Sequence, residues 1–100
     1  MKKHPGWCPA WCEDRIVNRR ETDQYDVFIG HGSKWGNPFN LEDFGRLRAI
    51  QIYETHIRRR PDLIAALPVL AGKILGCYCH PLPCHGEVLL KLLWEYHRLR

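Results

Sequence analysis

The segment 73–98 constrains the fold more than any other part of the chain. It begins with an apolar run at 73–78 that is typical of a short buried strand, and from residue 87 it becomes apolar-periodic, as in an amphipathic helix. Three cysteines and two histidines lie in between, namely Cys77, Cys79, His80, Cys84 and His85. α/β proteins keep their chemistry at such strand-to-helix turns. The sequence therefore predicts an α/β fold with its site in this turn.

The remaining elements indicate a small sheet with helices packed on it. The predicted strands are 15–19, 25–29 and 73–78, and the predicted helices are 42–59, 62–67 and 87–98. The apolar faces of the two long helices are predicted to carry Phe44, Leu47, Ile50, Tyr53 and Ile57, and then Val88, Leu92 and Tyr96. We expect one domain over 14–100, with three to four strands, two main helices and one short helix.

Length and composition set the class of protein. A chain of 100 residues has room for one core, and its 45% hydrophobic and 26% charged residues are ordinary for a globular domain. No apolar run approaches the roughly 20 residues of a membrane span, and residues 1–6 do not lead into a signal-peptide core. We expect a cytoplasmic protein with no membrane partner. Residues 1–13 are rich in Pro, Trp and Cys without any period, so we expect an irregular arm.

Charge and cysteine content bear on partners. The net charge of +4, mostly from arginine, favours an anionic partner, although arginines on solvated helix faces explain it equally well. The cysteines are five, an odd number, and three of them are crowded together. Reduced thiols or a bound metal therefore fit better than a disulfide scaffold. The apolar face of two long helices could also be covered by a second copy, which makes a homodimer one expected assembly.

The turn can carry catalysis. Cys84 stands three residues before Glu87, the spacing of a helix N-cap and its carboxylate partner, and a sulfur there would lie among unpaired amide donors. Helix N-termini stabilise thiolates. Cys84 or Cys79 is thus a candidate nucleophile, and His85 or His31 is a candidate for proton transfer.

The same residues can bind a metal. Zinc takes sulfur and nitrogen ligands, and the candidate set is Cys77, Cys79, Cys84 and His85, with Cys8 and Cys12 from the arm as alternatives. The spacing between Cys77 and Cys79 is tighter than in usual zinc motifs. Cys8 and Cys12, which lie beside two tryptophans, have the alternative of packing as buried thiols.

A second loop follows the predicted strand at 25–29 and has the composition of a ligand loop. Its glycines permit close backbone approach, its amides and lysine can hold a phosphate, its tryptophan offers a stacking face and its asparagine can read a base edge. The candidate ligand-binding residues are Gly30, His31, Ser33, Lys34, Trp35 and Asn37. The alternative is a structural turn with Trp35 and Phe39 buried.

The two loops together resemble a known family. The run 33–39, which contains Gly36-Asn37-Pro38-Phe39, and the motif from Cys77 to His85 are similar to those of the family called domain of unknown function 4326, over roughly residues 15–94. Members are small bacterial and phage proteins, and the family supplies no substrate. The resemblance implies that the two loops form the functional core. His31 stands where members often carry an arginine.

Two classes of function follow from these observations. In the first, the chain is an enzyme acting on a nucleotide, nucleobase or modified nucleic acid through its cysteines and histidines. In the second, it is a non-catalytic binding module, held by zinc or by packed thiols, that engages nucleic acid or a protein. A phage-type accessory protein that binds a host target is a variant of the second class.

Overall fold

The fold is built on a sheet of three parallel strands. The computed structural model describes residues 15–30, 32–39, 41–78 and 84–100. The strands are β1 (Ile16–Asn18), β2 (Val27–Phe28) and β3 (Leu75–Cys77), in the order β1-β3-β2. Gly76 of β3 pairs with Val17 on one side and with Phe28 on the other. Because both pairings are parallel, the carboxyl ends of all three strands meet at one edge of the sheet.

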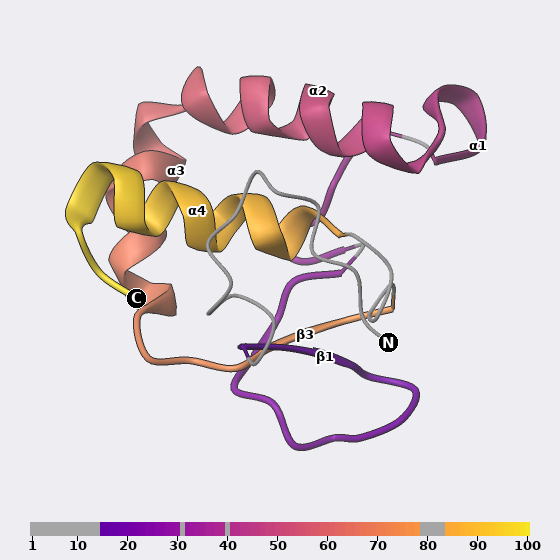
Figure 1. The fold of residues 1–100 in the computed structure, drawn as a ribbon, viewed down its shortest axis with the longest axis horizontal. Coiled ribbons are helices and arrows are strands. Elements are labelled where there is room, and N and C mark those ends of the chain that lie inside the picture. Colours follow the sequence, from indigo (N-terminus) through magenta and orange to yellow (C-terminus); the bar gives the residue numbers. More distant parts are fainter. Residues whose placement is uncertain (1–14, 31, 40, 79–83) are drawn as a thin grey trace.

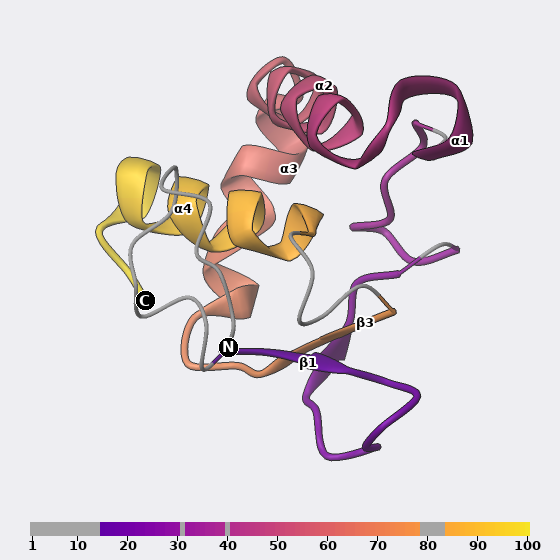
Figure 2. The same ribbon diagram turned by 45° about the vertical axis from the view of Figure 1, so that its right-hand side comes forward.

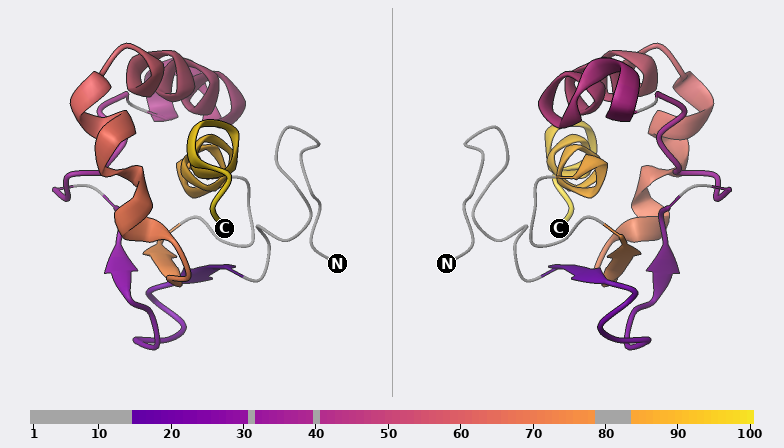
Figure 3. Two further views of the ribbon diagram at one scale, coloured as in Figure 1. Left: turned by 90° about the vertical axis from the view of Figure 1, so that its left-hand side faces the viewer. Right: turned by 90° about the vertical axis from the view of Figure 1, so that its right-hand side faces the viewer.

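The helices lie on one side of the sheet. They are α1 (Leu41–Phe44), α2 (Arg46–Arg58), α3 (Pro61–Ala66) and α4 (His85–His97), with the 3-10 helix η2 (Leu67–Leu70) after α3. In Figures 1 and 2, α4 lies over the strands and α2 lies over α4. The column of α3 and η2 descends from α2 toward the sheet (Figure 3). The predicted α/β class, with a small sheet of three strands, is confirmed. Among the described helices, none has the length and apolarity needed to cross a membrane.

Helix α4 is the centre of the core. Because it is enclosed by the sheet below, α2 above and η2 beside it, its first two turns are buried nearly all round rather than on one stripe. Its fully buried residues are Val88, Leu89, Leu90, Leu92 and Leu93. Gly86 permits the close approach to the sheet, since a Cβ there would lie 2.7 Å from Cδ1 of Ile29. The first turn of α4 is therefore pressed onto the strands.

The predicted helix over 42–59 is wrong in one respect. It is broken at Gly45, whose φ of 77° is a backbone conformation that favours glycine, so α1 and α2 are separate helices. Two residues predicted on its apolar face, Phe44 and Leu47, are exposed. Phe44 ends α1 and Leu47 stands in the first turn of α2, and in Figure 1 α1 and this end of α2 extend past α4. Tyr96 is also exposed, because its hydroxyl is held at the surface by Arg58.

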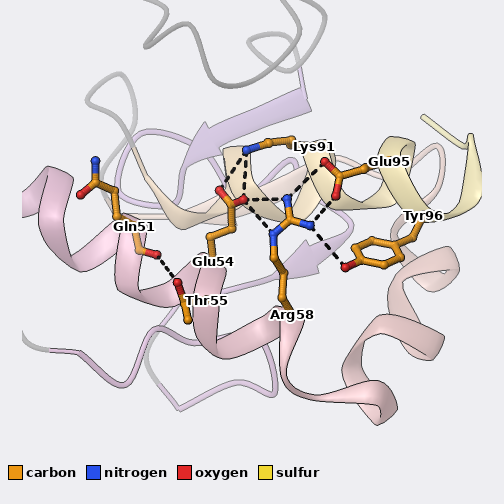
Figure 4. A network of polar contacts seen from close by, with 7 residues as sticks. All are labelled: Gln51, Glu54, Thr55, Arg58, Lys91, Glu95 and Tyr96. Carbon is orange, nitrogen blue, oxygen red and sulfur yellow. Dashed lines mark hydrogen bonds and ion pairs between the residues drawn. The ribbon is translucent and has the colours of Figure 1, made fainter.

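A polar network joins α2 to α4 across their exposed sides (Figure 4). Arg58 donates to Glu54 within α2 and to Glu95 of α4, while Lys91 of α4 donates to both oxygens of Glu54, at 3.0 and 3.1 Å. Burial alone would raise the pKa of Glu54, but the hydrogen bonds from Arg58 and Lys91 outweigh it and lower that pKa. The same guanidinium lowers the pKa of Glu95. Both carboxylates therefore stay ionised in this network.

Glu54→Gln should lower the free energy of unfolding by about 1 kcal/mol, because it removes the charge shared by two cations in a network that is only partly screened. Since folding lowers the pKa of Glu54, the stabilisation is present above about pH 4.3, the ordinary glutamate value, and is lost as the pH falls further. Urea unfolding at low and moderate salt measures it. Glu21→Gln, on an exposed loop, is the matched control. Equal effects of the two substitutions would contradict a stabilising network.

Candidate functional site

Two thiols meet at the carboxyl edge of the sheet. Cys77 is the last residue of β3, and Cys84 is the N-cap of α4, which confirms the capping prediction. Their sulfurs are 3.5 Å apart, and the amide of Gly86 donates to the Cys84 sulfur at 3.2 Å. The separation exceeds the roughly 2.05 Å of a disulfide bond, so both are thiols. Cys77 is 1% and Cys84 2% exposed. One first-turn amide of α4, that of Gly86, thus faces a sulfur that lies beside a second sulfur.

His85 is a buried, neutral imidazole that ties α4 to β2. Its Nε2 lies 2.6 Å from the carbonyl oxygen of Ile29. A carbonyl only accepts, so Nε2 carries the proton and donates it, which leaves Nδ1 as the basic nitrogen. Burial lowers the pKa of His85, although the bond to Ile29 acts in the opposite direction. The imidazole therefore serves first to fix the end of β2 against the start of α4.

Tyr53 connects the thiol site to the second loop. Its ring meets the ring of His85 edge to face at 4.9 Å, and its hydroxyl donates to the carbonyl oxygen of Trp35 at 2.6 Å. Burial raises the pKa of Tyr53, and the neighbouring Cys84 side chain acts in the same direction. The phenol consequently stays protonated and available as a donor. The buried side chain of Tyr53 therefore contacts both the first turn of α4, at His85, and the loop at 30–39, at Trp35.

Tyr53→Phe should lower the free energy of unfolding by about 2 kcal/mol, because it leaves the buried Trp35 carbonyl without its donor while keeping the ring. Tyr96→Phe, which removes a surface hydroxyl bonded to Arg58, should have a much smaller effect. Chemical unfolding of the two variants gives the comparison. Equal losses would mean that the Tyr53 hydroxyl does not hold the loop.

The second loop is organised by its own polar groups. The hydroxyl of Ser33 donates to the carbonyl oxygen of Gly30 at 2.7 Å. The Asn37 side chain accepts from the Phe39 amide at 2.9 Å and donates to the carbonyl of Ala49 at 3.3 Å. The side chains of Ser33 and Asn37 are therefore used to stabilise the loop itself.

Trp35 is 4% exposed and belongs to the core, as in the structural alternative raised by the sequence, whereas Phe39, which that alternative also buried, is half-buried. Lys34 is exposed, and its Nζ lies 5.5 Å from the centre of the Trp35 ring. Among the predicted ligand-binding residues that the structure describes, Lys34 is the one with an exposed, charged side chain.

Several predicted site residues lie outside the described residues, namely Cys8, Cys12, His31 and Cys79. Of the others, the structure brings Cys77, Cys84 and His85 to one edge of the sheet, and Tyr53 links them to the loop at 30–39. Within the described ranges, no three cysteine, histidine or acidic side chains are grouped to hold a metal ion. The imidazole of His85 is directed at a carbonyl instead.

Sequence reasoning missed a cluster at the same edge of the sheet as the thiols. Arg19, Arg20, Phe28 and Tyr78 follow or end the three strands at the same edge, and their flat groups lie against one another. The signal was present in part, since an Arg-Arg pair directly follows a strand candidate, but its contact with Tyr78 requires the sheet order. A hollow of about 230 Å³ lies elsewhere, and no predicted site residue lines it. Its lining is Phe39, Ile52, Thr55, His56, Arg59 and Arg60.

Comparisons with known proteins give viral relatives. The chain is similar to the uncharacterized 12.4 kDa protein in the nrdA-td intergenic region of Enterobacteria phage T4, with 35% identity over 83 residues, 79% of this chain and 76% of that protein. It is also similar to uncharacterized protein R718 of Acanthamoeba polyphaga mimivirus, with 31% identity over 98 residues, 76% of this chain and 75% of that protein. No solved structure matches it.

The family model described as a domain of unknown function matches residues 15–95. The match includes all three strands and the thiol pair, and it excludes the arm with Cys8 and Cys12. The chain therefore belongs to the family Domain of unknown function (DUF4326).

Proposed function

We propose that this chain is an enzyme that acts on a nucleotide, nucleobase or modified nucleic acid, with Cys84 as its nucleophile. The observation that carries the proposal is the hydrogen bond from the Gly86 amide to the Cys84 sulfur at the start of α4. An N–H donor and the partial positive charge of a helix N-terminus both favour the thiolate, which is the reactive form of cysteine. The carboxyl edge of a parallel sheet is where α/β proteins bind their ligands.

The neighbouring residues receive distinct roles. The Cys84 thiolate adds to an unsaturated, electrophilic carbon of the ligand, where the double bond opens and its electron pair takes up a proton. Cys77, with its sulfur 3.5 Å away, is close enough to exchange a proton with Cys84. His85 acts as a positioning residue, because its Nε2 proton is engaged by Ile29. Proton transfer to the ligand falls to His31 on the sequence evidence. Lys34 and the backbone of the loop at 30–39 would hold a phosphate.

A second function is favoured by a specific observation. Both sulfurs are almost completely buried, as expected for thiols that pack rather than react. In that case the chain is a non-catalytic binding module for nucleic acid or a protein target. A zinc-held version needs ligands from Cys8, Cys12 or Cys79, since the described cysteines and histidines do not form a set of three.

The test is to incubate the protein with nucleobases, nucleosides, nucleotides and short modified oligonucleotides, and to follow both the compounds and the protein by mass spectrometry. The proposal expects a changed compound, or an adduct that maps to Cys84 in the digested protein. Binding by thermal shift without any product or adduct would favour the packed-thiol module instead. An adduct that maps to Cys77 alone would contradict the assignment of the nucleophile.

A further inference from the structure

Four residues form a flat, cationic surface where the strands end, and we call it the arginine–aromatic surface. It consists of Arg19 and Arg20 after β1, Phe28 at the end of β2 and Tyr78 after β3. The rings of Phe28 and Tyr78 are 5.7 Å apart and nearly perpendicular. The guanidinium of Arg19 lies 4.7 Å from the centre of the Phe28 ring, and that of Arg20 lies 5.0 Å from the centre of the Tyr78 ring. Both arginines are exposed, and Tyr78 is 42% exposed.

The surface is held in place by bonds to the thiol strand. The Arg19 amide donates to the carbonyl of Cys77 at 2.7 Å, and its guanidinium donates to the Tyr78 hydroxyl at 3.1 Å. The Asn18 side chain accepts from the Arg20 amide at 2.8 Å and donates to the carbonyl of Tyr78 at 3.3 Å. The chain turn that presents the two arginines is therefore fixed against the residue that follows Cys77. Tyr78 directly follows Cys77, and because side chains alternate along a strand, its ring lies on the face of the sheet opposite to the Cys77 sulfur.

The charges of this surface are available to a ligand. Among the described residues, neither Arg19 nor Arg20 forms an ion pair with a carboxylate. Other arginines have structural partners: Arg15 donates to the carbonyls of Leu70 and Lys73, and Arg58 pairs with Glu54 and Glu95. The two surface arginines lie over rings instead. Arg19 uses one N–H for the Tyr78 hydroxyl, and the other N–H groups of the two guanidinium edges can meet an anion.

We propose that the arginine–aromatic surface binds single-stranded nucleic acid, with the arginines on phosphates and the unpaired bases on the exposed ring of Tyr78 and the guanidinium planes. Aromatic rings and guanidinium planes are the surfaces on which unpaired bases stack, and a duplex offers no free base faces. An acidic peptide would use the charges but not the rings. The inference rests on the proposed function in one respect, since it narrows the proposed ligand class to single-stranded nucleic acid.

The test measures fluorescence anisotropy of a labelled oligothymidine of about ten nucleotides, a length within the site sizes of single-strand binding folds. The wild type should bind, with an affinity that falls as salt rises from about 50 to 200 mM. Arg19→Ala with Arg20→Ala should weaken binding at least tenfold and reduce the slope of log affinity against log salt by about 1.4, at about 0.7 for each lost phosphate contact. Tyr78→Ala should weaken binding about tenfold through lost stacking.

Matched controls test whether binding depends on these four residues or on any exposed arginine or tyrosine. Arg48→Ala and Tyr96→Ala remove an exposed arginine and an exposed tyrosine from the helices and should leave the affinity unchanged. If the melting curve shows that the double arginine variant is unfolded, Arg20→Glu replaces it in the test, because this substitution alters a single exposed side chain that lies over one ring. Equal losses in the controls, or displacement of the strand by polyglutamate as readily as by unlabelled oligonucleotide, would overturn the inference.

The proposed function and this inference can be tested independently of each other. Cys84→Ser should bind the strand as the wild type does, because the serine retains the cap and lies outside the arginine–aromatic surface. If the wild type and Cys84→Ser both bind the strand and neither shows thiol chemistry, the proposed binding surface stands and the proposed enzyme activity is ruled out. If the protein turns over nucleotides but the Arg19, Arg20 and Tyr78 variants bind the strand as well as the wild type, the proposed binding surface is ruled out and the proposed enzyme activity stands.

Discussion

Cys84→Ala should reduce turnover of the substrate by at least about 10³-fold, as removal of a nucleophile does in thiol and hydroxyl enzymes. The fold should survive, because the loss of an N-cap acceptor costs only about 1 kcal/mol. Cys84→Ser makes the sharper experiment. Its oxygen accepts from the Gly86 amide at least as well as sulfur does, so stability is retained while a hydroxyl is a poor nucleophile at neutral pH. Steady-state rates and melting temperatures of both variants separate chemistry from capping.

Cys77→Ser is the matched control for that experiment. It changes a thiol that is equally buried and 3.5 Å from Cys84, but it leaves the donor from α4 untouched. We expect at most a tenfold loss of turnover, through the altered surroundings of Cys84. Wild-type turnover in Cys84→Ser, or complete loss in Cys77→Ser alone, would show that the nucleophile has been assigned to the wrong residue.

The second large effect is a loss of stability in mild acid. Burial lowers the pKa of His85 in the folded protein, whereas in the unfolded chain it is that of an ordinary histidine, about 6.5. Between those two values the unfolded chain binds one more proton than the folded protein. The free energy of unfolding should therefore be at its full value above about pH 6.5 and fall by about 1.4 kcal/mol per pH unit until the folded pKa is reached.

His85→Gln tests the origin of this slope. The glutamine amide can still donate to the Ile29 carbonyl, but it does not titrate, so the stability of this variant should change much less between pH 7 and 5. His56→Gln is the control, since His56 is a half-buried histidine of α2 that lies outside the hydrogen bond to Ile29. Urea unfolding at several pH values measures all three proteins. A slope that persists in His85→Gln and disappears in His56→Gln would contradict the neutral, buried imidazole.

Local patterns were enough to predict the strand-to-helix turn. The apolar run before Cys77, the period after Glu87 and the three-residue spacing from Cys84 to Glu87 are all short-range features, and short-range rules describe them well. The break at Gly45 escaped the same rules, because the apolar period runs through it without interruption. A single glycine within a periodic segment is tolerated in many helices, so its positive φ becomes evident only in the structure.

The rest of the site depends on tertiary pairing. The arginine–aromatic surface exists because β3 lies between β1 and β2, which brings Tyr78 beside Arg19 and Phe28, residues about 50 to 60 positions away along the chain. Nothing in the local sequence specifies that order of strands. The burial of Trp35 has a similar cause, since its carbonyl is held by Tyr53 from the other side of the core. These contacts require the assembled fold.

The most direct test of the Cys84 thiolate is the rate at which iodoacetamide labels each cysteine of the native protein as the pH is varied, read by peptide mass. We predict that Cys84 is labelled faster than Cys77, and that its rate reaches half of its maximum at a pH below about 8.5, the value for an unstructured cysteine. Labelling of Cys84 only as fast as the protein unfolds, or a half-maximal rate at pH 8.5 or above, would contradict a reactive thiolate and leave both sulfurs as packing groups of the core.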